Sequence, residues 1–411
     1  MKIIDVKAYP IRIQQDDTSS SKNVSEFDKG RKEVSDQSFG GKSERPPIRD
    51  LGDHFIDETH HTSIYSKYHE TTVVRVETSD GVIGWGESQS PVSPNTTATI
   101  INDLIYPLIL NADILDVEAI WHNNFTAMRE RGHYTGFYID AISGVDIAIW
   151  DAIGKTFKLP THKLMGGRHR NSVKIYNGIG GRDSKKITEM AEWSISKGYK
   201  ALKLHLRESI ERTVDIVSEV RKSIGNNIDL MLDVHMMFNT HEAIKLGKQL
   251  ENFNVYWLES PSDPNDIPGQ IEISRSLDMP IANGEWTRTK FEMREIFEKR
   301  AYDISMPDIA RTGLTGAKQI ASIAHLYNIP VAPHVGGGGI LSVASTVQFS
   351  IATPNFLIME HSEQGNKMKS LFLSKPFEPE NGSFPVTEKP GLGIDINEEL
   401  LQKFILKPPS K

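Results

Sequence analysis

The sequence contains no cysteine, and this absence excludes several kinds of chemistry. A chain of 411 residues without cysteine forms no disulfides, offers no thiolate nucleophile and holds no cysteine-ligated zinc. It also lacks an apolar run near the roughly 20 residues that a membrane-spanning helix needs. The formal net charge is −7, so the basic footprint of a nucleic-acid-binding protein is missing. We therefore expect neither a membrane nor a nucleic acid as a partner.

Several common nucleotide and hydrolase motifs are also missing from an otherwise ordinary composition. Hydrophobic residues make up 38% and charged residues 25% of the chain, as in typical globular domains. Neither a GxxxxGK[ST] phosphate loop nor a GxSxG nucleophile turn occurs. The first residues, MKIIDVKAYPIRI, alternate apolar and polar side chains and lack the zones of a secretory signal. We therefore expect a cytoplasmic protein.

What the sequence does contain is a regular series of acidic and histidine residues in its second half. Successive members are 26, 26, 23, 26 and 26 residues apart, namely Asp233, Glu259, Glu285, Asp308, His334 and Glu360. Each ends or directly follows a short apolar run, as in MLD, YWLE and LIME. Strands that each deliver a polar group at the C-terminal end are typical of a (β/α)8 barrel, whose active site lies at that end. The series therefore predicts both an α/β fold and a reactive face.

Eight strand segments alternate with helical stretches in the region that carries the series. They are 172–178, 199–206, 228–235, 254–260, 280–286, 302–307, 329–335 and 355–361. Their nearly continuous apolar runs suit parallel strands buried on both faces, and crossover helices close such strands into a barrel. We therefore predict a (β/α)8 TIM barrel over 136–365, followed by a C-terminal segment, 366–411, that packs on the N-terminal part.

Residues 1–135 have a different pattern, which predicts a separate α+β unit. A strand over 1–13 and a hairpin over 71–88 are followed by helical periodicity. An insertion at 14–69 interrupts the unit. We predict a surface loop over its polar stretch, 14–53, with an active-site lid as the alternative.

Three carboxylates of the series lie on consecutive strands and predict a metal site. Adjacent strands are roughly 5 Å apart, so Asp233, Glu259 and Glu285 can converge on one point. Three carboxylates without a counter-ion repel one another strongly, and a divalent cation relieves that repulsion. Oxygen ligands favour Mg²⁺ or Mn²⁺ over zinc or copper. We therefore predict that these three residues bind Mg²⁺.

The ends of the second and third strands add candidate acid/base groups. In KLHLR, Lys203, His205 and Arg207 alternate with leucines, so we expect Lys203 and His205 to face the barrel interior beside the metal. With a second cation beside it, Lys203 would have a lowered pKa and act as a base; a structural lysine–carboxylate pair is the alternative. His235 lies two residues beyond Asp233 and shares its side of the strand, unless it caps the following helix.

Strands six to eight complete the ring of candidate groups. Asp308 and His334 follow neighbouring strands, and a carboxylate beside an imidazole fixes the tautomer and raises the basicity of the ring. The pair predicts a general acid/base dyad, with a buried structural pair as the alternative. Glu360 is predicted to be an acid, an electrophile or a partner of Lys203. The glycines at 336–339 form a backbone that can cradle an anion.

With these motifs in place, the chain resembles the enolase superfamily and, within it, the mandelate racemase-like branch. Besides the Asp, Glu, Glu series, the resemblance rests on AISGVDIAIWDAIGKTFKLPTHKLMGG (141–167), GVIGWGES (81–88) and PGLGIDINEEL (390–400). It implies a modified barrel with an α+β capping domain, formed here by 1–135 and the tail. It also implies that a carboxylate substrate binds Mg²⁺, that a base removes the proton α to that carboxylate, and that the metal stabilises the enediolate.

Motif residues within this family distinguish one reaction from another. The usual strand-two motif is Lys-x-Lys, whereas this chain has Lys203-Leu204-His205. The motifs Asp233-Val234-His235 and Met359-Glu360-His361 resemble those of sugar-acid dehydratases. We therefore predict a Mg²⁺-dependent hydro-lyase that converts an aldonate or aldarate to a 2-keto-3-deoxy acid sugar.

In this prediction the acid/base groups come from two sides of the site. His334, backed by Asp308, is one of them, and His205, Lys203 or His235 is the other. A racemase or epimerase of a 2-hydroxy acid and a catalytically silent binding or regulatory protein are alternatives. A cycloisomerase is less favoured, because those of the family use lysines on strands two and six.

The expected partner is a small carboxylate, the acid sugar itself. We expect Arg207 and His60 to contact it, with part of the 14–69 insertion closing over the barrel mouth. We also expect the chain to form a homo-oligomer.

Overall fold

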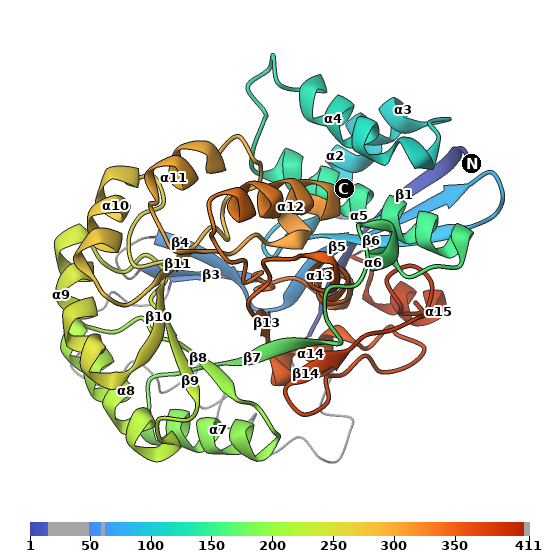
Figure 1. The fold of residues 1–411 in the computed structure, drawn as a ribbon. Helices are drawn as coiled ribbons and strands as arrows, with labels where there is room; N and C mark the ends of the chain where they lie inside the picture. The colour runs from blue at the N-terminus through green and yellow to red at the C-terminus, as the bar shows by residue number, and fades with distance from the viewer. Residues whose placement is uncertain (15–48, 59–61, 407–411) are drawn as a thin grey trace.

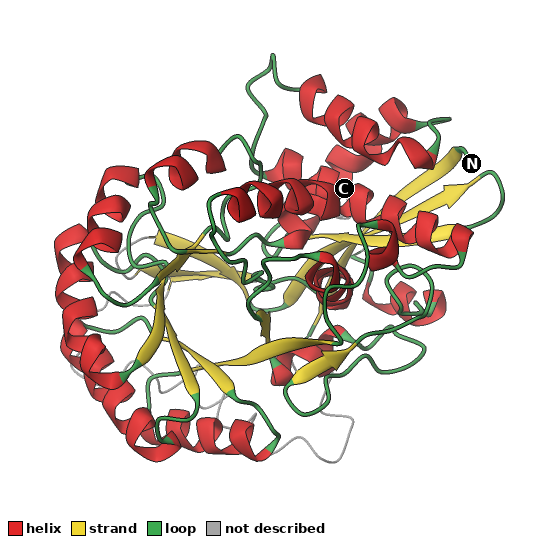
Figure 2. Cartoon of the chain, in the orientation of Figure 1, coloured by secondary structure: helices red, strands yellow, loops and turns green. Residues whose placement is uncertain are grey.

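Parallel strands surrounded by helices form a ring at the centre of the molecule (Figures 1 and 2). The computed structural model describes residues 1–14, 49–58 and 62–406. Neighbouring strands pair in the order β12, β11, β10, β9, β8, β7, β13, so the chain winds round the ring in sequence order until β13 returns to β7. These strands are β7 (Ser172–Gly180), β8 (Ala201–His205), β9 (Asp229–Asp233), β10 (Val255–Glu259), β11 (Ile281–Asn283), β12 (Ile304–Ser305) and β13 (Met359–His361).

The predicted seventh strand contributes isolated bridges rather than a full ladder. Val331 bridges Ser305 on one side and Phe356 on the other, which closes the ring between β12 and β13. Pro330 and Pro333 have no amide hydrogen to donate, so a continuous ladder cannot form there. The prediction of a (β/α)8-type barrel with an α+β capping domain is confirmed.

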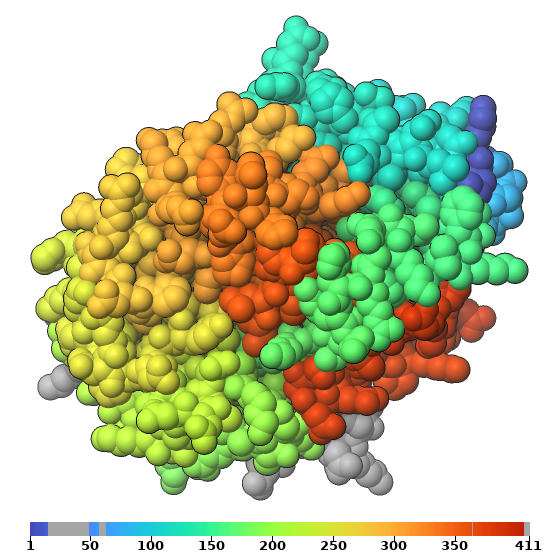
Figure 3. Space-filling model, viewed as in Figure 1, coloured from blue at the N-terminus to red at the C-terminus, as the bar shows by residue number. Residues whose placement is uncertain are grey.

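Alternation along the strands separates two hydrophobic cores. Inward side chains fill the barrel, among them Tyr176, Met231, Trp257, Ile304 and Ala332. The alternate leucines of β8 and its continuation join the larger core between strands and helices, as predicted for KLHLR. In the space-filling view side chains close the centre of the ring, which looks open in the ribbon (Figure 3). The barrel is therefore a packed core whose chemistry is confined to its ends.

Polar caps start most of the helices that cover the ring. The side chains of Asp183, Ser209, Asn239, Asp266 and Asp308 each accept a hydrogen bond from an amide of the first helical turn. The helices are α7 (Ser184–Ser196), α8 (Ile210–Ile224), α9 (Thr240–Leu250), α10 (Ile267–Ser276), α11 (Met293–Lys299), α12 (Ile309–Leu326) and α13 (Ile340–Ala352). Within the part of the chain that the structure describes, no helix is both long and apolar enough to cross a membrane.

A three-stranded antiparallel sheet and a long helix form the core of the N-terminal part. The sheet consists of β1 (Ile3–Ile13), β5 (His69–Thr78) and β6 (Ile83–Ser88), in that order. Helix α5 (Phe137–Phe157) packs on β6 at the glycines of GWGE. A Cβ on Gly84 would lie 2.0 Å from the carbonyl oxygen of Ala148, so only glycine permits this approach. Shorter helices follow the hairpin as predicted: α2 (Pro94–Ile100), η2 (Ile101–Ile105), α3 (Tyr106–Ile109), η3 (Ile114–Asp116) and α4 (Val117–Ala127).

Part of the insertion forms a second small sheet, which the sequence did not predict. The strands β2 (Arg49–Leu51), β3 (His54–Glu58) and β4 (Thr62–Ser66) pair antiparallel. The prediction of a loop over 14–53 is therefore wrong at β2. Three residues are too short a run for strand periodicity to register, and pairing with β3 decides their conformation. The stretch 15–48 lies outside the described residues.

The C-terminal segment contacts both parts of the molecule. Its strand β14 (Ser383–Pro385) pairs antiparallel with β7 of the barrel. Further along, Ile405 bridges Ile11 of β1. The segment also contains α14 (Glu363–Lys369), which starts in the last residues of the predicted barrel domain, and α15 (Glu398–Leu401). The domain limits 1–135, 136–365 and 366–411 stay a prediction.

Candidate active site

Three buried carboxylates meet at the C-terminal ends of neighbouring barrel strands. Asp233 ends β9 and is paired in register with Glu259, which ends β10. Glu285 follows β11 by two residues. One oxygen from each lies within 4.8 Å of the others, and all three side chains are buried. The predicted ligand residues are therefore brought together, and their oxygen donors fit the preference of Mg²⁺.

Burial and mutual repulsion make it unfavourable for all three carboxylates of this cluster to be ionised without a counter-ion. Burial, the largest cause, raises the pKa of Glu259 to about 8; Lys203 opposes the rise, and the carboxylates of Asp233, Glu360 and Glu285 add to it. A bound divalent cation would remove that repulsion, which is the physical reason to expect one here.

Lys203 lies between two carboxylates inside the barrel mouth. Its Nζ is 2.6 Å from Oε1 of Glu259 and 2.8 Å from Oε1 of Glu360, and it is fully buried over the ring of Tyr176. Burial alone would lower the pKa of Lys203, but these two carboxylates raise it well above its usual value. The expected lowered pKa is therefore wrong: the neighbours are anions rather than a second cation. These contacts are those of the lysine–carboxylate pair that the sequence left open as the alternative, and a catalytic role for Lys203 stays a prediction.

Two histidines contact the outer oxygen of Asp233. His205 Nδ1 is 3.0 Å and His235 Nε2 is 3.4 Å from Asp233 Oδ2, and the two rings are stacked with centroids 5.8 Å apart. His235 reaches this place because it and Met236 adopt left-handed backbone conformations, with φ of 46° and 57°. Burial lowers the pKa of His235, and the carboxylates of Asp233 and Glu285 oppose this only in part. His235 therefore faces the cluster instead of capping α9, whose cap is Asn239.

The Asp308–His334 pair has the geometry expected of a dyad. His334 Nδ1 is 2.7 Å from Oδ2 of Asp308, whose other oxygen accepts the amide of Ala310 at the start of α12. On its other side, His334 Nε2 is 2.8 Å from Oε2 of Glu285. Burial would lower the pKa of His334, but Glu285 and Glu360, with the hydrogen bond to Asp308, raise it well above its usual value. The imidazole is thus oriented by one carboxylate and presents its second nitrogen to the cluster.

The glycine loop after His334 holds carboxylates of the chain itself. Oε2 of Glu360 accepts the amides of Val335 and Gly336 at 2.9 and 3.0 Å, and Glu87 accepts the amide of Gly339 at the start of α13. The backbone amides of this loop therefore do bind anionic groups, as predicted. The groups that they bind in the described structure are the carboxylates of Glu360 and Glu87. Glu360 joins Lys203 to the loop that carries His334.

Lys369 is a neighbour of the site that sequence reasoning missed. It comes from α14, is 7% exposed, and its Nζ donates to the carbonyl of Gly336 at 3.2 Å. A Cβ on Gly336, which has a φ of 29°, would lie 2.2 Å from Cε1 of His334. Gly336 is thus held at its amide by Glu360 and at its carbonyl by Lys369 while it packs on the catalytic candidate. The segment EQGNKMK of α14 is mostly polar, so no sequence pattern pointed to the burial of Lys369.

The two predicted substrate contacts have different outcomes. The guanidinium of Arg207 lies 4.8 Å from the ring centroid of Tyr65 and hydrogen-bonds its hydroxyl. This contact brings β4 of the insertion over the end of β8. His60 lies outside the described residues. Both stay predictions as substrate contacts.

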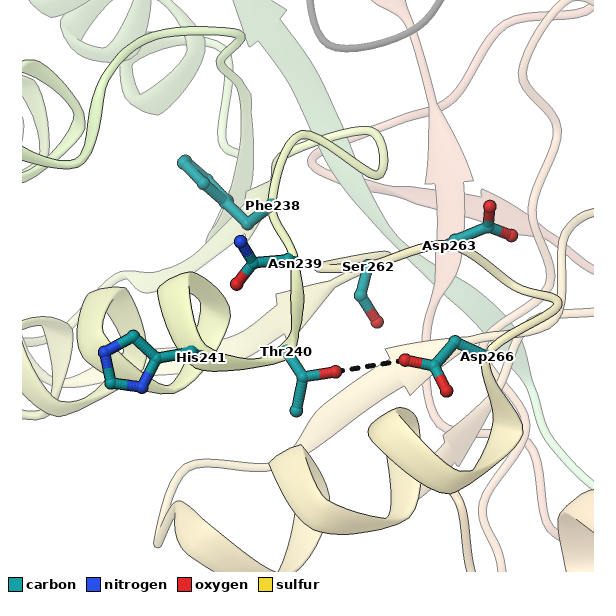
Figure 4. A pocket seen from close by; sticks show the side chains of 7 residues that line it. All are labelled: Phe238, Asn239, Thr240, His241, Ser262, Asp263 and Asp266. Carbon is teal, nitrogen blue, oxygen red and sulfur yellow. Dashed lines mark hydrogen bonds between the residues drawn. The ribbon is translucent and has the colours of Figure 1, made fainter.

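A hollow of about 340 Å³ lies further out, between the loops that follow β9 and β10 (Figure 4). Its lining includes Phe238, His241, Ser262 and Asp263, and the hydroxyl of Thr240 donates to Asp266 across it. None of the predicted site residues lines it. The hollow is therefore separate from the carboxylate cluster.

Comparison with known proteins agrees with this geometry. A family model described as "Mandelate racemase / muconate lactonizing enzyme, N-terminal domain" matches residues 56–166, and one described as "Enolase C-terminal domain-like" matches residues 186–400. The chain belongs to the enolase superfamily. The pair of models puts it in the mandelate racemase-like branch of the enolase superfamily, as the motifs predicted.

Relatives within the enolase superfamily carry more than one activity in their names. The D-galactarolactone cycloisomerase of Agrobacterium fabrum is 32% identical and covers 82% of this chain and 92% of its own. The D-xylonate dehydratase of Haloferax volcanii is 31% identical, with coverages of 82% and 85%. The crystal structure of the 3,6-anhydro-D-galactonate cycloisomerase of Zobellia galactanivorans superposes with a TM-score of 0.82 at 25% identity, over 99% of this chain and 100% of its own.

Proposed function

We propose that the chain is a Mg²⁺-dependent acid-sugar dehydratase. It removes the proton α to the carboxylate of an aldonate or aldarate and expels the 3-hydroxyl as water, which leaves a 2-keto-3-deoxy acid. The observation that carries the proposal is the arrangement of acid/base groups around one carboxylate cluster. His334 enters from the β12 side, and His205 and His235 enter from the ends of β8 and β9. Elimination needs a base for the α-proton and an acid for the leaving hydroxyl.

The carboxylate cluster would hold the metal and the substrate carboxylate. Asp233, Glu259 and Glu285 supply the oxygen ligands. A bound Mg²⁺ supplies charge that binds the substrate carboxylate and stabilises the negative charge that develops when the α-proton leaves. Lys203 adds a fixed positive charge on the same side, and Glu360 keeps it in place at 2.8 Å.

His334 moves one proton of the reaction in this proposal. Asp308 holds its Nδ1, so Nε2 is the atom that exchanges a proton with the substrate. His205 or His235 moves the other proton. Arg207 and His60 would bind the hydroxylated end of the substrate, where Tyr65 of the insertion meets Arg207.

A cycloisomerase is the second candidate, and the names of two of the proteins above support it. The same two proton transfers open a ring when the leaving oxygen belongs to that ring, and the product then has the mass of the substrate. Against this candidate, the sixth strand is followed by Asp308 rather than by a lysine.

One experiment separates the candidates. Purified protein with Mg²⁺ is incubated with a library of aldonates, aldarates and their lactones and anhydro forms, in normal and deuterated water, and products are followed by mass spectrometry and a 2-keto-acid assay. Loss of one water with keto-acid formation supports the dehydratase. A keto acid of unchanged mass indicates a cycloisomerase, and solvent deuterium in the substrate without a keto acid indicates a racemase or epimerase. No change across the library would overturn the enzyme proposal in favour of a binding protein.

A further inference from the structure

His205, Asp233 and His235 form a second cluster of ligand atoms on the outer side of the carboxylate site. One ligand atom from each residue lies within 4.8 Å of the others. His205 Nδ1 and His235 Nε2 both face Asp233 Oδ2. Both imidazoles are partly exposed, with side-chain exposures of 33% and 29%, whereas Asp233 is buried. A small ion can therefore reach this cluster from the solvent side.

The spacing of these atoms matches that of ligands around a transition-metal ion. Such ions bind nitrogen and oxygen at about 2.0–2.1 Å. Adjacent ligands at that radius are about 3.0 Å apart in octahedral and about 3.4 Å apart in tetrahedral coordination, by geometry from the same bond length. The two nitrogens lie 3.0 and 3.4 Å from Asp233 Oδ2.

The backbone is strained in a way that keeps His235 in this place. His235 and Met236 both have positive φ, in the left-handed region that non-glycine residues rarely adopt. The amide of His235 donates to Asp233 Oδ1 at 2.9 Å, which folds the chain back on that carboxylate. Strain of this kind costs of order 1–3 kcal/mol per residue and concentrates at functional sites. Asp233 thus supports the turn with one oxygen and offers the other to both histidines.

The ligand atoms of His205, Asp233 and His235 favour a different kind of ion than the all-oxygen site does. Two imidazoles and one carboxylate suit zinc, cobalt, nickel, copper and iron, whereas the all-oxygen set of Asp233, Glu259 and Glu285 suits Mg²⁺. Asp233 belongs to both sets, so its carboxylate lies between the two candidate cation sites.

We propose that His205, Asp233 and His235 form a second cation site, which takes a divalent first-row transition ion such as Zn²⁺ or Co²⁺ beside the all-oxygen site. Occupancy ties up both histidines that are candidates for one proton transfer, so the ion inhibits turnover even when Mg²⁺ is saturating. The inhibition rests on the proposed dehydratase function; the binding does not.

Cobalt spectroscopy on the chelator-treated full chain tests the binding without any substrate. Co²⁺ is titrated in the presence of excess Mg²⁺ and followed by its visible absorption, and Cu²⁺ is bound for electron paramagnetic resonance. We expect one Co²⁺ per chain that Mg²⁺ does not displace, and a Cu²⁺ spectrum split by nitrogen nuclei. His205→Asn and His235→Asn should each weaken Co²⁺ binding at least tenfold. Glu259→Gln, which changes only the inner site, and His241→Asn, an exposed histidine on α9, should not.

Displacement of Co²⁺ by Mg²⁺ would overturn the proposal, and so would Co²⁺ affinity that is unchanged in both histidine variants. Circular dichroism checks that each variant is folded, and the wild-type Cu²⁺ spectrum decides the matter if a variant is not. Zn²⁺ inhibition at saturating Mg²⁺ is measured once a substrate is known. If no substrate is found, the cobalt and copper spectra still decide whether the second site exists.

Discussion

At the scale of single residues, the candidate active site consists of buried charged groups that hold one another in place. Lys203 is shared by Glu259 and Glu360, and His334 lies between Asp308 and Glu285. Removing one partner of a buried ion pair leaves the other uncompensated, at a cost of about 3–5 kcal/mol. Substitutions here therefore need isosteric replacements if chemistry is to be separated from folding.

His334→Asn should abolish turnover and leave the fold intact. Asparagine keeps a polar group near Asp308 but cannot exchange a proton, so kcat should fall by roughly 10²–10⁴-fold. Steady-state kinetics on the substrate found in the library checks this, with thermal unfolding as the measure of folding. His325→Asn, at an exposed position of α12, is the control. Near-normal kcat would remove the dyad from the mechanism.

Glu259→Gln should weaken Mg²⁺ binding at least tenfold. The amide keeps the shape of the side chain but removes one of three anionic ligands and the counter-charge 2.6 Å from Lys203. Isothermal titration calorimetry with Mg²⁺ measures the change. A matched variant, Glu251→Gln, alters a carboxylate outside the cluster. Unchanged Mg²⁺ affinity in Glu259→Gln would exclude this residue as a ligand.

At the scale of elements, the turn after His334 is positioned by parts of the chain remote in sequence. The Glu360 side chain from β13 holds the amide of Gly336, and Lys369 from α14 holds its carbonyl. The turn packs so closely on His334 that any side chain at 336 would overlap the imidazole. The orientation of the His334 ring, the proposed acid/base group, thus depends on a contact from the C-terminal segment.

Lys369→Met should lower kcat about tenfold with little change in KM. Methionine fills the same buried space without a charge, but the Gly336 carbonyl loses its donor and the turn beside His334 relaxes. The pH profile of kcat should shift as well, which a purely structural loss would not cause. Lys367→Met, exposed on the same helix, is the control, and Lys369→Arg should restore part of the activity. Wild-type kinetics in Lys369→Met would show that the contact does not matter for catalysis.

At the scale of the whole molecule, α5 ties the capping sheet to the barrel through Asp146. Its carboxylate accepts the hydroxyl and the amide of Thr315 on α12, at 2.6 and 2.9 Å. Trp150 donates to the same hydroxyl at 2.9 Å. This buried network joins two helices that pack on different layers, so its energetics affect the stability of the entire chain.

Asp146 should make the free energy of unfolding fall as the pH rises from about 4 to about 7. Burial, the largest cause, raises the pKa of Asp146 to about 7, and hydrogen bonds from Thr315 only partly oppose it. The folded state therefore holds a proton that the unfolded chain releases near pH 4, and the stabilisation is lost as pH rises through the folded value. The contribution is of order 4 kcal/mol.

Urea unfolding between pH 4 and pH 8 measures this dependence. The free energy of unfolding of Asp146→Asn should lack this part of the slope, whereas Asp103→Asn, on an exposed turn of η2, should keep it. Parallel curves for the wild type and Asp146→Asn would contradict the assignment.

Much of the fold could be predicted from the sequence because the signals are local. A strand that ends in a polar residue is visible in five or six letters, and its recurrence at 23 to 26 residues predicts a barrel before any contact is known. The same reasoning brought Asp233, Glu259 and Glu285 to one face, since neighbouring strands of a barrel must be adjacent. The hairpin over 71–88 was likewise predicted from a local pattern.

Only the tertiary structure decided the features that depend on contacts between distant residues. The charge of Lys203 follows from Glu259 and Glu360, which lie 56 and 157 residues away along the chain, and the sequence had suggested a lowered pKa. Lys369 belongs to no recognisable sequence motif, and the packing of α14 brings it to the carbonyl of Gly336. The strand β2 has only three residues, too few to show an alternation of apolar and polar side chains. The sequence by itself determined which residues stand at the strand ends, because alternation along a strand is a local property. Their ionisation and their partners are decided by the folded molecule, because an electrostatic field sums over everything that folding brings near.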